Sequence, residues 1–292
     1  WFIGMQNTLL TMVVDVVVNV TNIAASLIFA LPCKMGIAGI ALGTVVAQWT
    51  GFTVSLVLMI VNYGKMFRLI NVRESIRWSN YKKFFSLNVH LYFRSLLLLV
   101  VYTGFTSISA RYGDVELAVS SAMMKLLLLY SYFTDGFAYA AEALTGRFIG
   151  AKDPARLKKT IHLVFIWCLA IGVVSTLVYG SSGKLMVQIF TNDPAVIAGC
   201  APYLFWLVRM PRVSCIAFTW DGVYIGATAS RSLVLSMLWS AVSFVAVYLI
   251  LSPLRGLQAL YAAYFSHLIV RSAYLTLVRR RDIPYLAEWK KS

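Results

Sequence analysis

Apolar residues run through the chain in eight long stretches that are separated by short polar segments. A helix needs about 20 mostly apolar residues to cross a bilayer, and each stretch reaches about that length. We expect spanning helices at 9–31, 36–62, 86–109, 117–147, 159–180, 196–225, 231–251 and 257–279. The pattern therefore predicts an all-α polytopic membrane protein with eight transmembrane helices.

The connecting segments contain sequence signals for two helix N-termini. Asp153-Pro154 and Asp193-Pro194 each place an acceptor side chain before a proline. Aspartate is a favoured N-cap residue, and proline is tolerated at the first helical position. We expect a helix to begin at each proline.

Polar residues of the first expected helix recur at intervals of three and four, which places them on one helical face. They are Thr8, Thr11, Asp15, Asn19, Asn22 and Ser26. A carboxylate facing lipid is costly, so this face should point into the protein. Two roles fit it: Asp15, Asn19 and Asn22 line a substrate cavity, or the polar groups bond to neighbouring helices.

The fourth expected helix repeats this pattern. Its polar face comprises Ser121, Lys125, Tyr132, Asp135, Tyr139 and Glu142. We treat Lys125, Tyr132, Asp135 and Tyr139 as candidates for lining the cavity. Lys125 lies too far from Asp135 to pair with it, so it would neutralise a carboxylate of another helix. Glu142 is either part of this face or a solvated residue near the cytoplasmic end.

The sixth expected helix carries Asp221 near its inner end and Pro211 at its middle, between two arginines. Proline should kink the helix and free backbone carbonyls, which makes Pro211 a candidate hinge. Arg209 and Arg212 would pair with acidic groups or reach a polar cavity. Arg94, in the third helix, is expected to reach toward the cytoplasmic surface.

The distribution of basic residues predicts the topology. Of 26 Lys and Arg residues, 17 fall in alternate loops and the C-terminal tail on one side, and four fall in the loops on the other. Cytoplasmic loops carry the excess of positive charge, so we expect 63–85 and the C-terminus in the cytoplasm. The net charge of +15 then reflects topology, and no basic patch indicates nucleic acid.

Composition supports this interpretation. Apolar residues make up 60% of the chain and charged residues 13%, which excludes a disordered chain, a disulfide-rich module and an ordinary cytosolic enzyme. The four cysteines form no C-x-x-C pair and the three histidines are scattered, which argues against a metal site. There is no G-x-S-x-G, Walker loop or G-x-G-x-x-G motif. We expect neither an enzyme nor a cofactor.

A short internal repeat suggests two related halves. Phe2-Ile3-Gly4 resembles Tyr224-Ile225-Gly226, and Gly36-Ile37-Ala38-Gly39-Ile40 resembles Gly256-Leu257-Gln258-Ala259-Leu260. The last two helices would thus repeat the first two, as in transporters built from two six-helix halves. We expect two N-lobe helices in 1–63, a cytoplasmic basic linker in 64–85, a six-helix C-lobe in 86–280 and a cytoplasmic tail in 281–292.

Several segments resemble the multidrug and toxic compound extrusion (MATE) transporters, and the last of them most resembles the DNA-damage-inducible subgroup. They are Gly4-Met5-Gln6-Asn7-Thr8 with Asn19 and Asn22, 36–41, Asp135-Gly136-Phe137-Ala138 with 141–143 and Gly146, 150–153, 190–196, and Asp221-Gly222-Val223-Tyr224-Ile225-Gly226-Ala227-Thr228. The resemblance covers nearly the whole chain and rests on the order and spacing of these segments.

The resemblance implies twelve helices in two lobes, of which this chain holds the fifth to the twelfth and lacks the first four. It implies a monomer that exports organic cations or amphiphilic drugs from a bacterial inner membrane in exchange for H⁺ or Na⁺. Asp15, Asn19 and Asn22 would belong to the N-lobe, and Lys125, Asp135 and Asp221 to the C-lobe. Asp135 and Asp221 are the candidates for ion coupling, because protonation removes the cost of burying a charge.

Three alternatives remain open at this point. A flippase for lipid-linked oligosaccharides would share the architecture and favour a more basic cavity, for which the chain offers Arg94, Lys125, Arg209 and Arg212. A membrane-embedded transferase would need clustered His, Asp or Glu at one membrane face. A truncated, nonfunctional product is the third.

Overall fold

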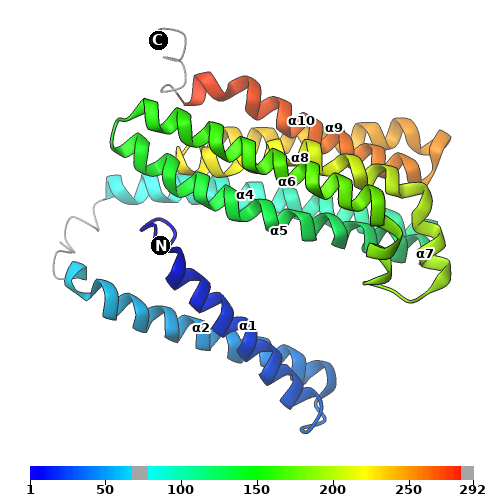
Figure 1. Ribbon diagram of the computed structural model, residues 1–292, viewed down its shortest axis with the longest axis horizontal. Helices are drawn as coiled ribbons and strands as arrows, with labels where there is room; N and C mark the ends of the chain where they lie inside the picture. Colours follow the sequence, from blue (N-terminus) through cyan, green and yellow to red (C-terminus); the bar gives the residue numbers. More distant parts are fainter. Residues whose placement is uncertain (68–77, 284–292) are drawn as a thin grey trace. The chain divides into compact units, whose positions relative to one another are not determined.

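The computed structural model describes residues 1–67 and 78–283 and is helical almost throughout. The described part contains eight long helices and one short one, labelled in Figure 1. They are α1 (Thr8–Ala30), α2 (Gly36–Phe67), α4 (Trp78–Ser109), α5 (Asp114–Gly150), α6 (Pro154–Gln188), α7 (Pro194–Cys200), α8 (Leu204–Gly226), α9 (Ser230–Arg255) and α10 (Leu257–Asp282). The predicted all-α fold is confirmed.

All eight expected spans are helical, but their apolar character differs. In the described residues, α1, α2, α4, α5, α6 and α9 are long and apolar enough to cross a membrane. Helices α8 and α10 fall outside this group. Each carries charge inside its apolar run: Asp221 with two arginines in α8, and Arg271 in α10.

One expected span is not continuous. The predicted helix 196–225 consists of α7, a single 3₁₀ turn at Ala201–Tyr203 and α8. Pro202 accounts for the break, because proline lacks an N–H and clashes with the preceding helical turn. Both expected helix starts are confirmed: the Asp153 carboxylate accepts from the Arg156 N–H at 2.9 Å, and Asp193 accepts from the Ala195 N–H at 2.8 Å.

The contacts divide the chain into two compact units, residues 1–82 and 83–292. In the first unit, α1 packs along α2. Gly39 and Gly43 permit this approach, because a Cβ there would lie 2.7 Å and 2.5 Å from atoms of α1. Asn22 donates to the Thr44 hydroxyl across the two helices at 3.2 Å.

In the second unit, α8 is the central helix and packs against α5, α6 and α10, while α9 packs along α10 (Figure 1). Buried hydroxyls tie the helices together by donating to backbone carbonyls of neighbours. The pairs are Tyr130 to Pro211 (2.9 Å), Tyr179 to Leu126 (2.7 Å), Tyr224 to Leu275 (2.7 Å), Thr176 to Val208 (3.0 Å) and Ser272 to Val213 (3.0 Å). Polar groups of this kind are typical links between membrane helices.

The two matching segments of the sequence repeat share a backbone feature. Gly36 opens α2 with φ +55°, and Gly256 precedes α10 with φ +52°. Residues with a Cβ rarely adopt this left-handed conformation, so glycine is the residue that suits both turns. The helix pairs α1–α2 and α9–α10 are thus joined through equivalent glycines.

Candidate functional site

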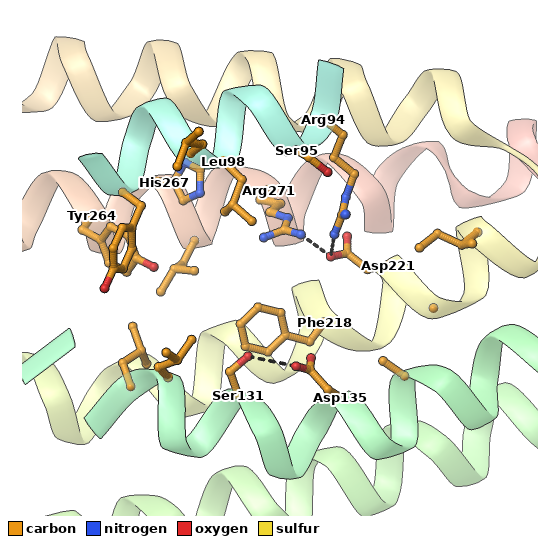
Figure 2. A pocket seen from close by; sticks show the side chains of 18 of the residues that line it. Arg94, Ser95, Leu98, Ser131, Asp135, Phe218, Asp221, Tyr264, His267 and Arg271 are labelled. Atoms are coloured by element: carbon orange, nitrogen blue, oxygen red, sulfur yellow. Dashed lines mark hydrogen bonds and ion pairs between the residues drawn. The ribbon is translucent and has the colours of Figure 1, made fainter. Parts of the chain in front are cut away.

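A cavity of about 590 Å³ lies within the second unit, between α4, α5, α8 and α10. Figure 2 shows its polar side chains, which converge from four helices. The polar and charged lining residues include Arg94 and Ser95 of α4, Ser131, Asp135 and Glu142 of α5, Asp221 of α8, and His267 and Arg271 of α10. Leucines and the Phe218 and Tyr264 rings supply much of the remaining wall.

Asp221 is held by two arginines. Arg94 Nη2 lies 2.6 Å from Asp221 Oδ2, and Arg271 Nη2 contacts the same oxygen (Figure 2). Asp221 and Arg271 are both buried, with exposed fractions of 6% and 2%. A buried charge is tolerated in a protein interior when it is paired and hydrogen-bonded. The cluster therefore joins α4, α8 and α10 through one carboxylate.

The expectation that Arg94 reaches the cytoplasmic surface is wrong. Helix α4 begins at Trp78 rather than at residue 86, so Arg94 lies 16 residues, or about 24 Å, along the helix. At that depth its guanidinium meets Asp221, which satisfies the charge inside the protein. The apolar pattern placed the start of this helix at residue 86, because the residues from Trp78 up to that point are helical but not apolar.

Asp135 has different surroundings. Its carboxylate lies across the cavity from the arginine cluster, with the Phe218 ring between them in Figure 2. Its hydrogen bond comes from the Ser131 hydroxyl at 3.5 Å, one turn earlier on α5. Within the described part of the chain, neither Asp135 nor Glu142 forms a salt bridge. The cavity thus contains two carboxylates that form no ion pair with any of the residues described.

The structure brings together only part of the polar face predicted on the fourth helix. Asp135, Tyr139 and Glu142 line the cavity, whereas Lys125 and Tyr132 do not and are exposed on α5. Each follows a lining residue, Met124 or Ser131, by one position, which is about 100° around the helix. The Asp221 carboxylate of α8 is paired with Arg94 and Arg271, and a carboxylate partner for Lys125 on another helix stays a prediction.

The predicted face of the first helix serves two kinds of hydrogen bond. Asn22 bonds to α2, as described above, while Asn19 donates to the Asp15 backbone carbonyl at 2.8 Å, within its own helix. The Asp15 side chain is exposed on α1. Asn22 therefore links α1 to α2, and a cavity role for Asp15, Asn19 and Asn22 stays a prediction.

Pro211 lies inside α8, which continues through it. The residue is buried, and its carbonyl accepts from the buried Tyr130 hydroxyl. The hinge role stays a prediction. Arg209 and Arg212 are exposed and line no part of the cavity. The Arg209 guanidinium instead lies 3.8 Å from the centroid of the Phe205 ring, a cation–π contact.

Tyr130→Phe tests the link between α5 and the centre of α8. Loss of one buried hydrogen bond should lower the free energy of unfolding by about 1 kcal/mol. Thermal unfolding of the purified protein in detergent measures the change. Tyr132→Phe, an exposed change on the same helix, serves as the control and should leave the midpoint where it is.

Sequence reasoning missed Arg271 and His267. His267 is 1% exposed and stacks on Tyr264, with ring centroids 5.8 Å apart. A lone arginine inside an otherwise apolar helix was the available signal for Arg271, because such a charge requires a partner. The spacing of residues on one helix does not reveal which other helix supplies that partner.

The MatE family model matches residues 91–254, which is more than half of the chain and includes α4 from Leu91 onward, α5, α6, α8 and nearly all of α9. The chain belongs to the MatE family. Together with the apolar helices, membership makes it a multi-pass membrane protein.

Individual relatives agree with this assignment. The chain is 31% identical over 288 residues to "DNA damage-inducible protein F" of Escherichia coli (strain K12), covering 96% of this chain and 61% of that protein. It is 24% identical over 272 residues to "Protein DETOXIFICATION 42" of Arabidopsis thaliana, covering 93% and 52%. "Multidrug and toxin extrusion protein 1" of Oryctolagus cuniculus is 27% identical over 192 residues, covering 64% and 33%. The MatE chain thus spans between one third and about three fifths of these relatives.

Solved structures share the fold. An outward-facing multidrug resistance MATE family transporter superimposes with a TM-score of 0.85 at 16% identity, covering 100% of this chain and 65% of that one. A Vibrio cholerae MATE transporter gives a TM-score of 0.81 at 15% identity, covering 98% and 66%. These similarities confirm the MATE architecture that the sequence motifs implied.

Proposed function

We propose that the protein is a secondary antiporter that exports organic cations or amphiphilic compounds in exchange for H⁺ or Na⁺. Membership of the MatE family supports a transport function, and the names of its relatives include multidrug and toxin extrusion. The cavity supports the substrate class: carboxylates attract a cation, and the Phe218 and Tyr264 rings suit a planar apolar body.

The observation that carries the proposal is the contrast between the two coupling candidates. Asp221 already has two guanidinium groups at one oxygen, so its charge is compensated inside the protein. Asp135 faces the same cavity and, in the part of the chain that the structure describes, accepts from the Ser131 hydroxyl and forms no ion pair. We therefore assign ion coupling to Asp135 and a structural role to Asp221.

In this mechanism the substrate and the coupling ion compete for Asp135. The ionised carboxylate holds the cationic substrate when the cavity is open to the cytoplasm. After the lobes rock to the outward-open state, H⁺ or Na⁺ neutralises Asp135 and the substrate leaves. The coupling ion then returns the lobes to the inward-open state.

Asp135→Asn tests this assignment. In inside-out vesicles that contain the full-length protein, an imposed ion gradient should drive ethidium accumulation by the unmodified protein. The variant should accumulate ethidium at least about tenfold more slowly, because Asn can neither bind the ion nor attract the cation. Ser131→Ala keeps the carboxylate and serves as the control; its rate should stay within about threefold, since it loses one weak hydrogen bond. Equal rates in Asp135→Asn and the unmodified protein would remove Asp135 from coupling.

The lipid-linked oligosaccharide flippase is the second candidate, and the arginines of the cavity are the feature in its favour. Arg94 and Arg271 are both engaged by Asp221, however, and Lys125, Arg209 and Arg212 lie outside the cavity. The cavity therefore offers little free positive charge for a diphosphate. Lipid flipping without ethidium transport would favour this candidate.

The remaining parts of the proposal concern placement and partners. We propose a bacterial plasma-membrane location with the C-terminus in the cytoplasm, supported by the uneven distribution of basic residues. We also propose a monomer surrounded by lipid, with no nucleic-acid partner. Within the described residues no group of three or more His, Cys, Asp or Glu side chains could hold a metal ion.

A further inference from the structure

A second cavity, of about 450 Å³, lies between α6, α8 and α10 and shares no lining residue with the first. Lys158, His162 and Arg279 line it, and no aspartate or glutamate does so among the described residues. Its other walls are mostly apolar and include Phe165, Ile166, Leu169, Cys215, Ile216 and Trp220. We call this cavity the α6/α8/α10 groove.

The groove is basic at one end and apolar along its length. Lys158 lies in the second turn of α6 and Arg279 in the last turn of α10, and Figure 1 shows these helix ends at the same end of the second unit. From there the groove follows α6 to Leu169, 11 residues or about 16 Å away. This distance is about half of the 30 Å hydrocarbon core of a bilayer, which corresponds to one leaflet.

The floor of the groove is a fixed aromatic surface. The Trp220 indole N–H donates to the Thr276 hydroxyl at 2.9 Å, and the Phe165 ring packs against Trp220 with centroids 4.9 Å apart. The Arg279 guanidinium lies 5.9 Å from the Trp220 ring centroid. The Asp282 carboxylate, three residues further along, is paired with Arg281 at 2.9 Å and is not part of the lining of the groove.

We propose that the α6/α8/α10 groove binds an anionic phospholipid, which goes beyond the transport function. The phosphate lies between Lys158 and Arg279, and one acyl chain follows Ile166 and Leu169, whose side chains are 48% and 50% exposed. Basic pockets between membrane helices on the cytoplasmic side are suited to acidic headgroups, and the apolar walls suit the chain. Charge complementarity thus selects an acidic lipid over a neutral one.

The test compares two double variants that lose the same charge. Lys158→Gln with Arg279→Gln removes the basic end of the groove, whereas Lys159→Gln with Arg280→Gln alters neighbours that do not line it. Native mass spectrometry of the full-length protein, titrated with phosphatidylglycerol or phosphatidylcholine, measures the fraction that retains lipid. We expect the groove variant to bind phosphatidylglycerol roughly tenfold more weakly and the control variant to change by less than about twofold.

Equal weakening in both double variants, or equal retention of phosphatidylcholine and phosphatidylglycerol by the unmodified protein, would overturn the proposal. Binding of soluble glycerol phosphate as tight as that of phosphatidylglycerol would show a headgroup site to which the acyl chain adds nothing, and would overturn it as well. Ile166→Trp provides a second approach that leaves every charge in place, because it fills an exposed part of the groove. It should reduce lipid retention, whereas Leu163→Trp, exposed on α6 outside the groove, should not.

Discussion

Asp221→Asn should lower the free energy of unfolding by about 3–5 kcal/mol, because it leaves two guanidinium groups together without their shared anion. Arg271 is buried and cannot move its charge into water without unfolding the contact between α8 and α10. The amide of Asn can accept a hydrogen bond but carries no charge. Thermal unfolding of the purified variant in detergent should therefore occur at a much lower temperature.

Removing one of the two arginine charges should lower the free energy of unfolding far less than removing Asp221. Arg94→Gln leaves Arg271 and Asp221 as a one-to-one pair, so it should destabilise the protein by much less than Asp221→Asn. Adding Arg94→Gln to Asp221→Asn should restore part of the loss, because it removes one of the two repelling charges. An Asp221→Asn variant that unfolds at the same temperature as the unmodified protein would show that the three side chains are not a stabilising cluster.

Gly222→Ala should destabilise the protein by about 1–3 kcal/mol or more, because it forces α5 and α8 apart. A Cβ at residue 222 would lie 2.1 Å from the backbone oxygen of Ala138, and a helix backbone cannot yield as a flexible side chain can. Gly136 offers a matched control next to the other cavity carboxylate, since a Cβ there meets nothing within 4 Å. Alanine also favours helix over glycine, so Gly136→Ala should be neutral or stabilising.

The same thermal unfolding experiment measures both glycine variants. The Gly136→Ala variant should unfold at or above the midpoint temperature of the unmodified protein. The Gly222→Ala variant should unfold well below it. The reverse order, or equal midpoints, would contradict the close approach of the two helices at Gly222.

The sequence was sufficient to predict the helices and the family, because both depend on local patterns. A run of about 20 apolar residues marks a membrane span wherever it occurs, and the Asp153 and Asp193 caps act within three residues of themselves. Asp135 was found for a similar reason: a carboxylate inside an apolar helix stands out without knowledge of its neighbours.

The arrangement around Asp221 could not be predicted in the same way. Its partners come from positions 127 and 50 residues away, and the periodicity of one helix says nothing about another. Lys125 shows the limit of helical periodicity from the other side. It lies on the predicted polar face of α5, but one residue, about 100° of rotation, separates it from the wall of the cavity. Only packing decides which part of a polar face encloses the cavity.

The central claim is that the substrate and the coupling ion compete for the Asp135 carboxylate, and binding under varied ion conditions tests it most directly. Fluorescence titration of the detergent-solubilised full-length protein with ethidium gives the Kd at several pH values and Na⁺ concentrations. The account predicts that the Kd rises as pH falls or as the Na⁺ concentration increases. In Asp135→Asn the Kd should be higher and should depend on neither pH nor Na⁺. A Kd in Asp135→Asn that keeps the ion dependence of the unmodified protein would contradict it.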